Sequence, residues 1–470
     1  MKKTNDLGKD SIFPLVCKLA IPTMIAQLVN VLYSIVDRMF IGNIPVIGDL
    51  ALAGAGVCGP IVTLLSSFGT LVGLGGSILM SMKLGEKKEK EAQSIINNSF
   101  LTLIILSLSL TIGFLLSKDA LLVRFGASPS TFQYADTYLT IYTFGTFFAL
   151  LGIGMNYFIT CQGFSLISMA TVITGAISNV ILDAIFIFVF DLGIAGAALA
   201  TVLSQVLSCS LTLLFLFNTK KFRLFKSRPQ ISIAFGNYSF KLVRKILAIG
   251  FSPFIILATD SLIIIVMNAA LQHYGGSANG DQLVSAATII QSYMLLITGP
   301  MAGITGGTQA IISYNYGAAN TNRVKHAEKI ILALTVCFST IMFLISRFLP
   351  QVFVHIFTSD VELIKLSTWG IRVFTIGIIP LSFQYVLVDG LTALGRTKTA
   401  LTLSVLRKSL YMVFTMVIPI FFQTKNAFFA EPLSDILCSC ITTIVFLMVF
   451  SKHLHMRESA FSCNDSLLTP

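Results

Sequence analysis

Residues 28–42, LVNVLYSIVDRMFIG, and residues 177–190, ISNVILDAIFIFVF, are apolar enough to lie in lipid, yet each contains an acid. The acids are Asp37 and Asp183. A charged side chain at the centre of a bilayer costs at least about 2.5 kcal/mol, so an acid inside a span indicates a proton, ion or substrate site. For Asp37 a second interpretation stands beside this one, because Arg38 follows it and such a pair can snorkel to the membrane surface.

The whole chain has the composition of a polytopic membrane protein. Of its 470 residues, 55% are hydrophobic and 11% are charged, which is more apolar surface than a water-soluble core can bury. Twelve apolar runs are long enough to cross a bilayer. They are 15–41, 51–82, 94–117, 132–161, 166–190, 194–217, 246–272, 282–314, 327–349, 363–392, 398–422 and 428–451. We therefore predict an all-α membrane protein with twelve transmembrane helices.

The distribution of positive charge predicts the orientation. The termini and the loops on their side carry 23 Lys and Arg residues, whereas the loops on the other side carry five. The positive-inside rule then places both termini in the cytoplasm of a plasma-membrane protein. The first apolar run continues without a cleavage site, which predicts a span rather than a signal peptide. The net charge of +11 needs no nucleic-acid partner, and the eight cysteines lack metal-ligand or CxxC spacing.

The chain repeats itself at a constant offset of 232 in the numbering. The pairs that coincide are Gly48-Asp49 with Gly280-Asp281, Gly75 with Gly307, Gly85 with Gly317, Phe125 with Phe357, and Gly163 with Gly395. Each half has six predicted spans, so the halves share one orientation and are related by a pseudo-twofold axis along the membrane normal, with a substrate site at their interface. We predict an N-terminal lobe (1–217), a basic cytoplasmic linker (218–245), a C-terminal lobe (246–452) and a cytoplasmic tail (453–470).

Polar residues follow one face of the first predicted span. They are Thr23, Gln27, Asn30, Ser34 and Asp37, at steps of four, three, four and three residues. This spacing keeps all five on one side of a helix, and in lipid such a side must face protein or water. Ser and Thr can also satisfy backbone carbonyls in a packing seam. That alternative does not account for the amides or the acid, so we expect this face to line a cavity.

Counting residues from the span ends places several polar groups at one depth. Asn179 and Asp183 are one turn apart in the fifth span, and Thr201 lies in the sixth. With a rise of about 1.5 Å per residue, these groups share one outer layer with Asp37, which weakens the snorkelling interpretation of Asp37. Two neighbouring carboxylates repel when both are ionised and can hold a proton. The same oxygens can hold an alkali cation such as Na⁺, and the sequence does not choose between these ions.

Several motifs carry a family resemblance. They are LAIP (19–22), VDRMFIG (36–42), LGEKK (84–88), NVILD (179–183) and GIAGAALAT (193–201). In this order and spacing the chain resembles the multidrug and toxic compound extrusion (MATE) antiporters over all twelve spans, and it is most similar to the DinF-type and MepA-type branches. The resemblance implies that H⁺ or Na⁺ binds at Asp37, Asn179, Asp183 and Thr201.

The second half does not repeat the acids. The offset of 232 matches Asp183 with Thr415 and Asn179 with Tyr411, and a local shift of 228 matches Asp37 with Ile265. The second half has Asp260 in its first span, which we expect to reach Lys408 or Arg407 if spans 7 and 11 adjoin as spans 1 and 5 do. Two interpretations remain for Asp260, a structural charge pair and a contact with a cationic substrate.

The predicted function is export of organic cations or other amphiphilic compounds in exchange for H⁺ or Na⁺, by a monomer without a cofactor. We expect the substrate cavity to include Gln27, Asn30, Ser34 and Asp260. Pro22 removes a backbone hydrogen bond from the first span and is the predicted hinge. A flippase for lipids or lipid-linked oligosaccharides is the alternative within transport. An intramembrane enzyme is disfavoured, because Gly-x-Gly-Asp, HExxH and GxSxG motifs are absent.

Overall fold

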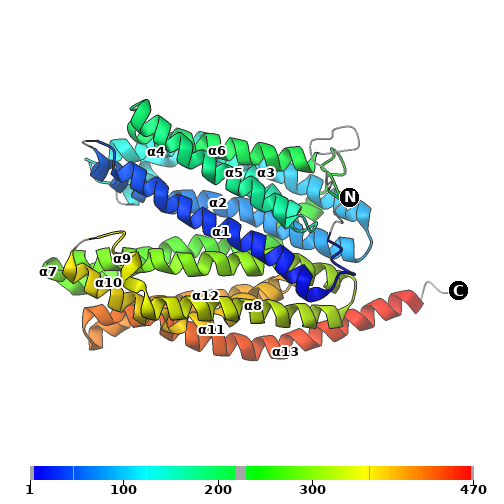
Figure 1. Cartoon of the computed structure of the whole chain (residues 1–470). Coiled ribbons are helices and arrows are strands. Elements are labelled where there is room, and N and C mark those ends of the chain that lie inside the picture. Colours follow the sequence, from blue (N-terminus) through cyan, green and yellow to red (C-terminus); the bar gives the residue numbers. More distant parts are fainter. Residues whose placement is uncertain (1–4, 46, 126, 218–228, 359, 467–470) are drawn as a thin grey trace.

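The computed structural model (Figure 1) is built of helices, and it describes residues 5–45, 47–125, 127–217, 229–358 and 360–466. Within these ranges there is no strand, and twelve segments are long and apolar enough to cross a membrane. The predicted all-α class and the twelve spans are confirmed. The α-helices are α1 (Ile12–Gly42), α2 (Gly48–Gly85), α3 (Glu89–Arg124), α4 (Phe132–Thr160), α5 (Ser165–Asp183), α6 (Gly193–Leu216), α7 (Phe240–Gly317), α8 (Thr321–Phe348), α9 (Pro350–Val354), α10 (Val361–Phe374), α11 (Ile378–Ala393), α12 (Thr397–Phe421) and α13 (Ala430–Ser466). A π-helix, η1 (Ala184–Val189), and two 3₁₀-helices, η2 (Thr375–Gly377) and η3 (Thr424–Phe429), complete them.

Each half of the chain forms its own helical bundle. In Figure 1 helices α1 to α6 lie together in the upper part, and α7 to α13 lie together in the lower part. Helix α7 supplies two spans, because the backbone turns at Gly276, whose φ of 63° suits a glycine. Both termini lie at one end of the bundle (Figure 1), which we call the terminal face.

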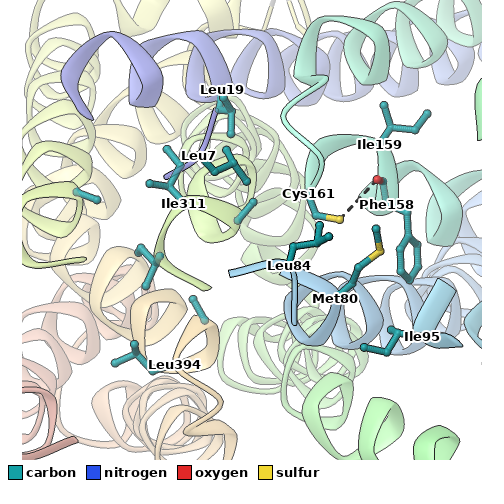
Figure 2. Packing of buried hydrophobic residues seen from close by; sticks show 14 of the residues in the cluster. Leu7, Leu19, Met80, Leu84, Ile95, Phe158, Ile159, Cys161, Ile311 and Leu394 are labelled. Atoms are coloured by element: carbon teal, nitrogen blue, oxygen red, sulfur yellow. Dashed lines mark hydrogen bonds between the residues drawn. The ribbon is translucent and has the colours of Figure 1, made fainter. Parts of the chain in front are cut away.

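The two bundles are joined by a common core near the terminal face. A single apolar cluster there takes residues from both halves, among them Leu7, Leu84, Ile311 and Leu394, and Figure 2 shows these side chains together. Away from the terminal face each half has its own apolar cluster. The cluster of the first half includes Ile41, and the cluster of the second half is built largely from α7 and α10. The two bundles therefore share one apolar core near the terminal face, and each has an apolar core of its own farther from that face.

Glycines make close contacts between the two halves, and one pair of these contacts follows the repeat. A Cβ added to Gly85 would lie 1.9 Å from the carbonyl oxygen of Tyr314, and one added to Gly317 would lie 2.1 Å from that of Met82. Gly85 and Gly317 are related by the offset of the repeat, and so are Met82 and Tyr314. The repeat found in the sequence therefore relates the two sides of this contact to each other.

Two helices extend past the predicted boundaries of the second lobe. Helix α7 begins at Phe240, so the last residues of the predicted linker are helical. Helix α13 continues to Ser466, because residues 453–466 contain neither Gly nor Pro to end it. Residues 218–228 of the linker and 467–470 of the tail lie outside the described residues. The division into lobes at 217 and 246 stays a proposal.

Candidate functional site

Asp37 in α1 and Asp183 at the end of α5 lie side by side in the half of the first bundle away from the terminal face. Asp183 is fully buried, and the two carboxyl groups are within hydrogen-bonding reach of each other. Ionised carboxylates only accept hydrogen bonds, so a hydrogen bond between the two groups would need a proton on one of them. Among the described residues no other donor reaches Oδ1 of Asp37 or either oxygen of Asp183. The pair therefore has the chemistry to share a proton or to bind a cation.

Asn179 and Thr201 complete the group that the depth count predicts. Asn179 lies one turn before Asp183, and its Nδ2 donates to Thr201 Oγ1 at 3.4 Å. Its Oδ1 atom is buried and receives no hydrogen bond from the described residues. Directly after Asp183, α5 continues as the π-helix η1, a rare form that occurs frequently at functional sites.

The oxygens of this site fit a proton or an alkali cation. Carboxylate, amide and hydroxyl oxygens are ligands for hard cations, and Asp37, Asn179 and Asp183 contribute four buried oxygens without a donor. In the described part of the chain, no three His, Cys, Asp or Glu side chains come together as a metal site. The donor set therefore fits exchangeable H⁺ or Na⁺ better than a tightly held transition metal.

Tyrosines surround the acid pair, and the sequence did not single them out. Tyr33 interacts electrostatically with both Asp37 and Asp183, and Tyr138 interacts with Asp37. Tyr142 stacks on Tyr138 with ring centroids 6.3 Å apart. Tyr33 lies four residues before Asp37, so the helical spacing that marked the polar face would also have found it. The other two tyrosines belong to α4, and no signal in the sequence places this helix near the acid pair.

The predicted hinge in α1 is tied to α5 by a hydrogen bond. Pro22 lies inside α1 and has no N–H to give to the carbonyl of Lys18. The hydroxyl of Ser165, the first residue of α5, donates to this carbonyl at 2.7 Å. Helix α1 runs continuously through Pro22. The Lys18 carbonyl, which Pro22 leaves without its backbone donor, is thus satisfied by α5, the helix that also carries Asp183.

A cavity of about 580 Å³ lies between the two bundles. Of the residues predicted for it, Gln27, Asn30 and Asp260 line it, and so does Asn179. Ser34 does not line it: its side chain is exposed, and Oγ donates to the carbonyl of Asn30 at 2.9 Å. This is the backbone-satisfying role that hydroxyls commonly take in membrane helices.

Charged residues of the second bundle form two groups beside the cavity. Lys408 is 3% exposed, and its Nζ contacts Oδ1 of Asp260 at 2.6 Å and also the carbonyl of Ile256. Arg407 contacts Asp435 at 2.9 Å and Glu431 at 3.4 Å. Asp260 thus pairs with Lys408 and also lines the cavity, so its two interpretations do not exclude each other.

Four acids of the second bundle were missed by the sequence reasoning. They are Glu328, Asp389, Glu431 and Asp435. Asp389 and Asp435 stand inside predicted spans, so the rule that marked Asp37 applies to them equally. Glu328 and Glu431 lie near span ends, where an acid is ordinary. Only the packing of α8 on α11, and of α12 on α13, identifies their neighbours.

Comparisons with known proteins give the family. The MatE family model matches residues 22–185 and 255–417, two segments that lie one in each half of the repeat. The chain is 24% identical to "Multidrug export protein MepA" of Staphylococcus saprophyticus over 89% of each chain. It is also 24% identical to the protein of that name from Staphylococcus haemolyticus, over 94% of this chain and 93% of the relative.

Solved structures agree in fold. A structure described as the outward-facing conformation of a multidrug resistance MATE family transporter of the MOP superfamily has a TM-score of 0.87 to this chain. The two are 20% identical, over 96% of this chain and 99% of that one. The resemblance drawn from the motifs is confirmed, and the chain belongs to the MatE family of multidrug export transporters, which are membrane transporters and not enzymes.

Proposed function

We propose that the chain is a plasma-membrane antiporter that exports amphiphilic organic cations in exchange for H⁺ or Na⁺ by alternating access. The observation that carries this proposal is the set of buried oxygens without a donor in Asp37, Asn179 and Asp183. A buried acceptor left unsatisfied costs about 1–3 kcal/mol, and two adjacent carboxylates also repel each other. Binding of a proton or Na⁺ removes both costs, so the ion stabilises the conformation in which α1 and α5 hold the acids together.

Helix α1 links the ion to the substrate. It carries Asp37 at one end and the cavity residues Gln27 and Asn30 nearer its middle, while Asn179 belongs to both the ion site and the cavity wall. A movement of α1 at Pro22 therefore changes the ion site and the cavity together. Exchange requires that ion and substrate favour different conformations, because a ligand with equal affinity for both conformations shifts neither.

The cavity suits flat, apolar cations. Its volume of about 580 Å³ is within the usual range for drug-sized ligands. Tyr33, Phe148, Tyr157 and Tyr385 are among its lining residues, and aromatic faces attract organic cations. The basic side chains of Arg407 and Lys408 are neutralised by acids. Amphiphilic cations are thus the substrate class that meets least repulsion there.

The termini are proposed to be cytoplasmic, from the excess of Lys and Arg on their side. The packed terminal face is then the cytoplasmic side of the membrane. In this conformation the cavity is sealed from the cytoplasm by the common core that includes Leu84, Ile311 and Leu394. The acid pair lies in the half that faces the cell exterior, from which the coupling ion enters.

Transport in proteoliposomes tests this proposal. Movement of a fluorescent cation such as ethidium is measured under an imposed pH or sodium gradient, for wild type, Asp37→Asn and Asp183→Asn. We expect each variant to lose gradient-driven transport by at least about tenfold, the factor that corresponds to about 1.4 kcal/mol of coupling. The matched control is Asp191→Asn, an exposed acid between η1 and α6 that should transport normally. Full gradient-driven transport by both Asp37→Asn and Asp183→Asn would refute the coupling assignment.

A further inference from the structure

Glu328 in α8 is a buried acid without a partner. It is 5% exposed, and neither carboxyl oxygen receives a hydrogen bond from the described residues. The carboxyl group packs on the backbone of α11, where a Cβ added to Gly390 would lie 2.4 Å from its Oε1. Leaving an ionised carboxylate in such a place is prohibitively costly, so Glu328 is built to hold a proton.

Asp389, the residue before Gly390, connects this acid to the cavity. It lines the cavity, lies near the polar side chains of Thr305 and Gln309 of α7, and interacts electrostatically with Glu328. Asp389 thus faces the cavity beside polar side chains, whereas Glu328 is buried away from the cavity and has no hydrogen-bond donor among the described residues. In this arrangement Glu328 can hold a proton away from the cavity, and Asp389 can pass it to the cavity.

The charged surroundings separate this pair from the other acids of the second bundle. Asp260 is paired with Lys408, and Glu431 and Asp435 are paired with Arg407. The titratable groups that face the Glu328–Asp389 pair are the two acids themselves, from α8 and α11, and Tyr157 from α4 across the cavity. From α7 the neutral side chains of Thr305 and Gln309 face Asp389. Within the described residues no cation is found to balance this pair.

The position of the pair in the repeat shows that it is not a copy of the first acid site. With the offset of 232, Asp389 corresponds to Tyr157 and Glu328 to Ile96. Asp389 is four residues before the end of α11, and Glu328 is seven residues after the start of α8. From the rise per residue of an α-helix, they lie about 6 to 10 Å from helix ends at the terminal face. Asp37 and Asp183 lie in the opposite half of the protein.

We propose that Glu328 and Asp389 form a second, independent proton-binding site, which exchanges its proton with the cavity near the terminal face. The proton is held on Glu328 and leaves through Asp389, since this acid alone of the two lines the cavity. Its use in export rests on the proposed function, whereas the binding of the proton does not. The two are therefore tested by separate measurements.

Infrared titration of the purified, detergent-solubilised protein tests the binding. The background is Asp37→Asn with Asp183→Asn, which removes the first acid pair. We expect a protonated carboxyl band at neutral pH that disappears on alkaline titration and whose loss point does not depend on Na⁺. The variant Glu328→Gln should lose this band, and Asp389→Asn should shift its titration. Glu362→Gln, the same change at an exposed acid of α10, should leave it unchanged.

Several outcomes would overturn the proposal. A band that persists in Glu328→Gln, that Asp389→Asn does not shift, or that fails to titrate up to the pH at which the protein unfolds would show a static acid. Displacement of the band by Na⁺ at constant pH would show a cation site instead. Glutamine keeps the shape of a protonated glutamate, so we expect Glu328→Gln to fold; if it does not, the shift in Asp389→Asn decides.

A second measurement asks whether the proton is used. Ethidium is added to the same Asp37→Asn, Asp183→Asn protein in weakly buffered solution, and a pH dye reports proton release. We expect release of about one proton per protein in this background, and a loss of this release in Glu328→Gln. If ethidium does not bind to wild type, the proposed function fails while the infrared result stands. If it binds without release in the background, the second site plays no part in export.

Discussion

The contacts that Gly85 and Gly317 make with the opposite half of the chain yield a prediction whose size follows from the structure. A Cβ at Gly85 would lie 1.9 Å from the carbonyl oxygen of Tyr314, and one at Gly317 would lie 2.1 Å from that of Met82. Ordinary van der Waals contact begins at 3.4 Å. With alanine at Gly85 the two backbones must therefore move apart by about 1.5 Å, and with alanine at Gly317 by about 1.3 Å. Backbone atoms, unlike the end of a side chain, cannot rotate out of the way.

Overpacking of this kind costs about 1–3 kcal/mol. The cost should fall on the conformation in which the terminal face is closed, because both clashes arise across the contact between the two halves there. We therefore expect Gly85→Ala and Gly317→Ala each to shift the equilibrium about 5-fold to 150-fold toward opening of the terminal face. Neither substitution touches the acids, so any change in ion affinity should follow from the shifted equilibrium alone.

Distances between spin labels check this prediction. Labels at Lys90→Cys and Asn322→Cys, both exposed on the terminal face, report its opening in a background without the exposed cysteines Cys337 and Cys440. The matched control is Gly113→Ala, because a Cβ at Gly113 meets no atom within 4 Å. Unchanged distance distributions in folded Gly85→Ala and Gly317→Ala, or an equal shift in Gly113→Ala, would contradict the reasoning.

Three further predictions concern single contacts. Asp260→Asn should lower the free energy of unfolding by about 3 kcal/mol, because it leaves the 3% exposed Lys408 ammonium without a counter-charge. Lys408→Met should cost less, since the Asp260 side chain is 49% exposed and stays hydrated. Thermal unfolding of both variants checks which of the two is less stable. Ser165→Ala should lower the free energy of unfolding by about 1 kcal/mol, because it removes the donor to the Lys18 carbonyl. Pro22→Ala should cancel this loss by restoring a backbone N–H to that carbonyl, and a double-mutant cycle measures the effect. Burial alone would raise the pKa of Glu86, but hydrogen bonds from Lys83, Arg457 and Lys88 outweigh burial and lower this pKa from 4.5 to about 2. The contact of Glu86 with Arg457 is therefore fully present above pH 4.5 and is lost as the pH falls toward 2. Acidification from pH 8 to 5 should thus leave this contact intact, and terminal-face label distances should respond to that change in the same way in wild type and in Glu86→Gln.

The spans were predictable because lipid imposes one rule on every residue. A backbone in hydrocarbon must satisfy its own hydrogen bonds, so apolar length alone identifies the helices. The meeting of Asp37 with Asp183 was also predictable, because two helices that run in the same direction place residues of equal depth at one level. The helix ends at Phe240 and Ser466 were not, since residues 240–245 and 453–466 are too polar to stand out as part of an apolar run.

The second bundle was predictable only in part, for a different reason. Pairing of Asp260 with a basic residue of α12 followed from the repeat, but the choice of Lys408 over Arg407 depends on which side of α12 faces α7. Arg407 points instead to α13, where Asp435 is fully buried. Adjacent residues on a helix differ in direction by about 100°, so a register that the sequence cannot give decides the partners.

The unpaired acids are distributed asymmetrically over the two bundles. The bundles share one scaffold, since Gly85 and Gly317 still make equivalent contacts, yet each bundle places its unpaired acids where the other has uncharged side chains. One pair lies away from the terminal face and the other lies near it. When two rigid bundles pivot about their common contact, opening of one face accompanies closing of the other. The same movement therefore exposes one acid pair while it buries the other, so on the present proposals a single conformational change alternates access to both.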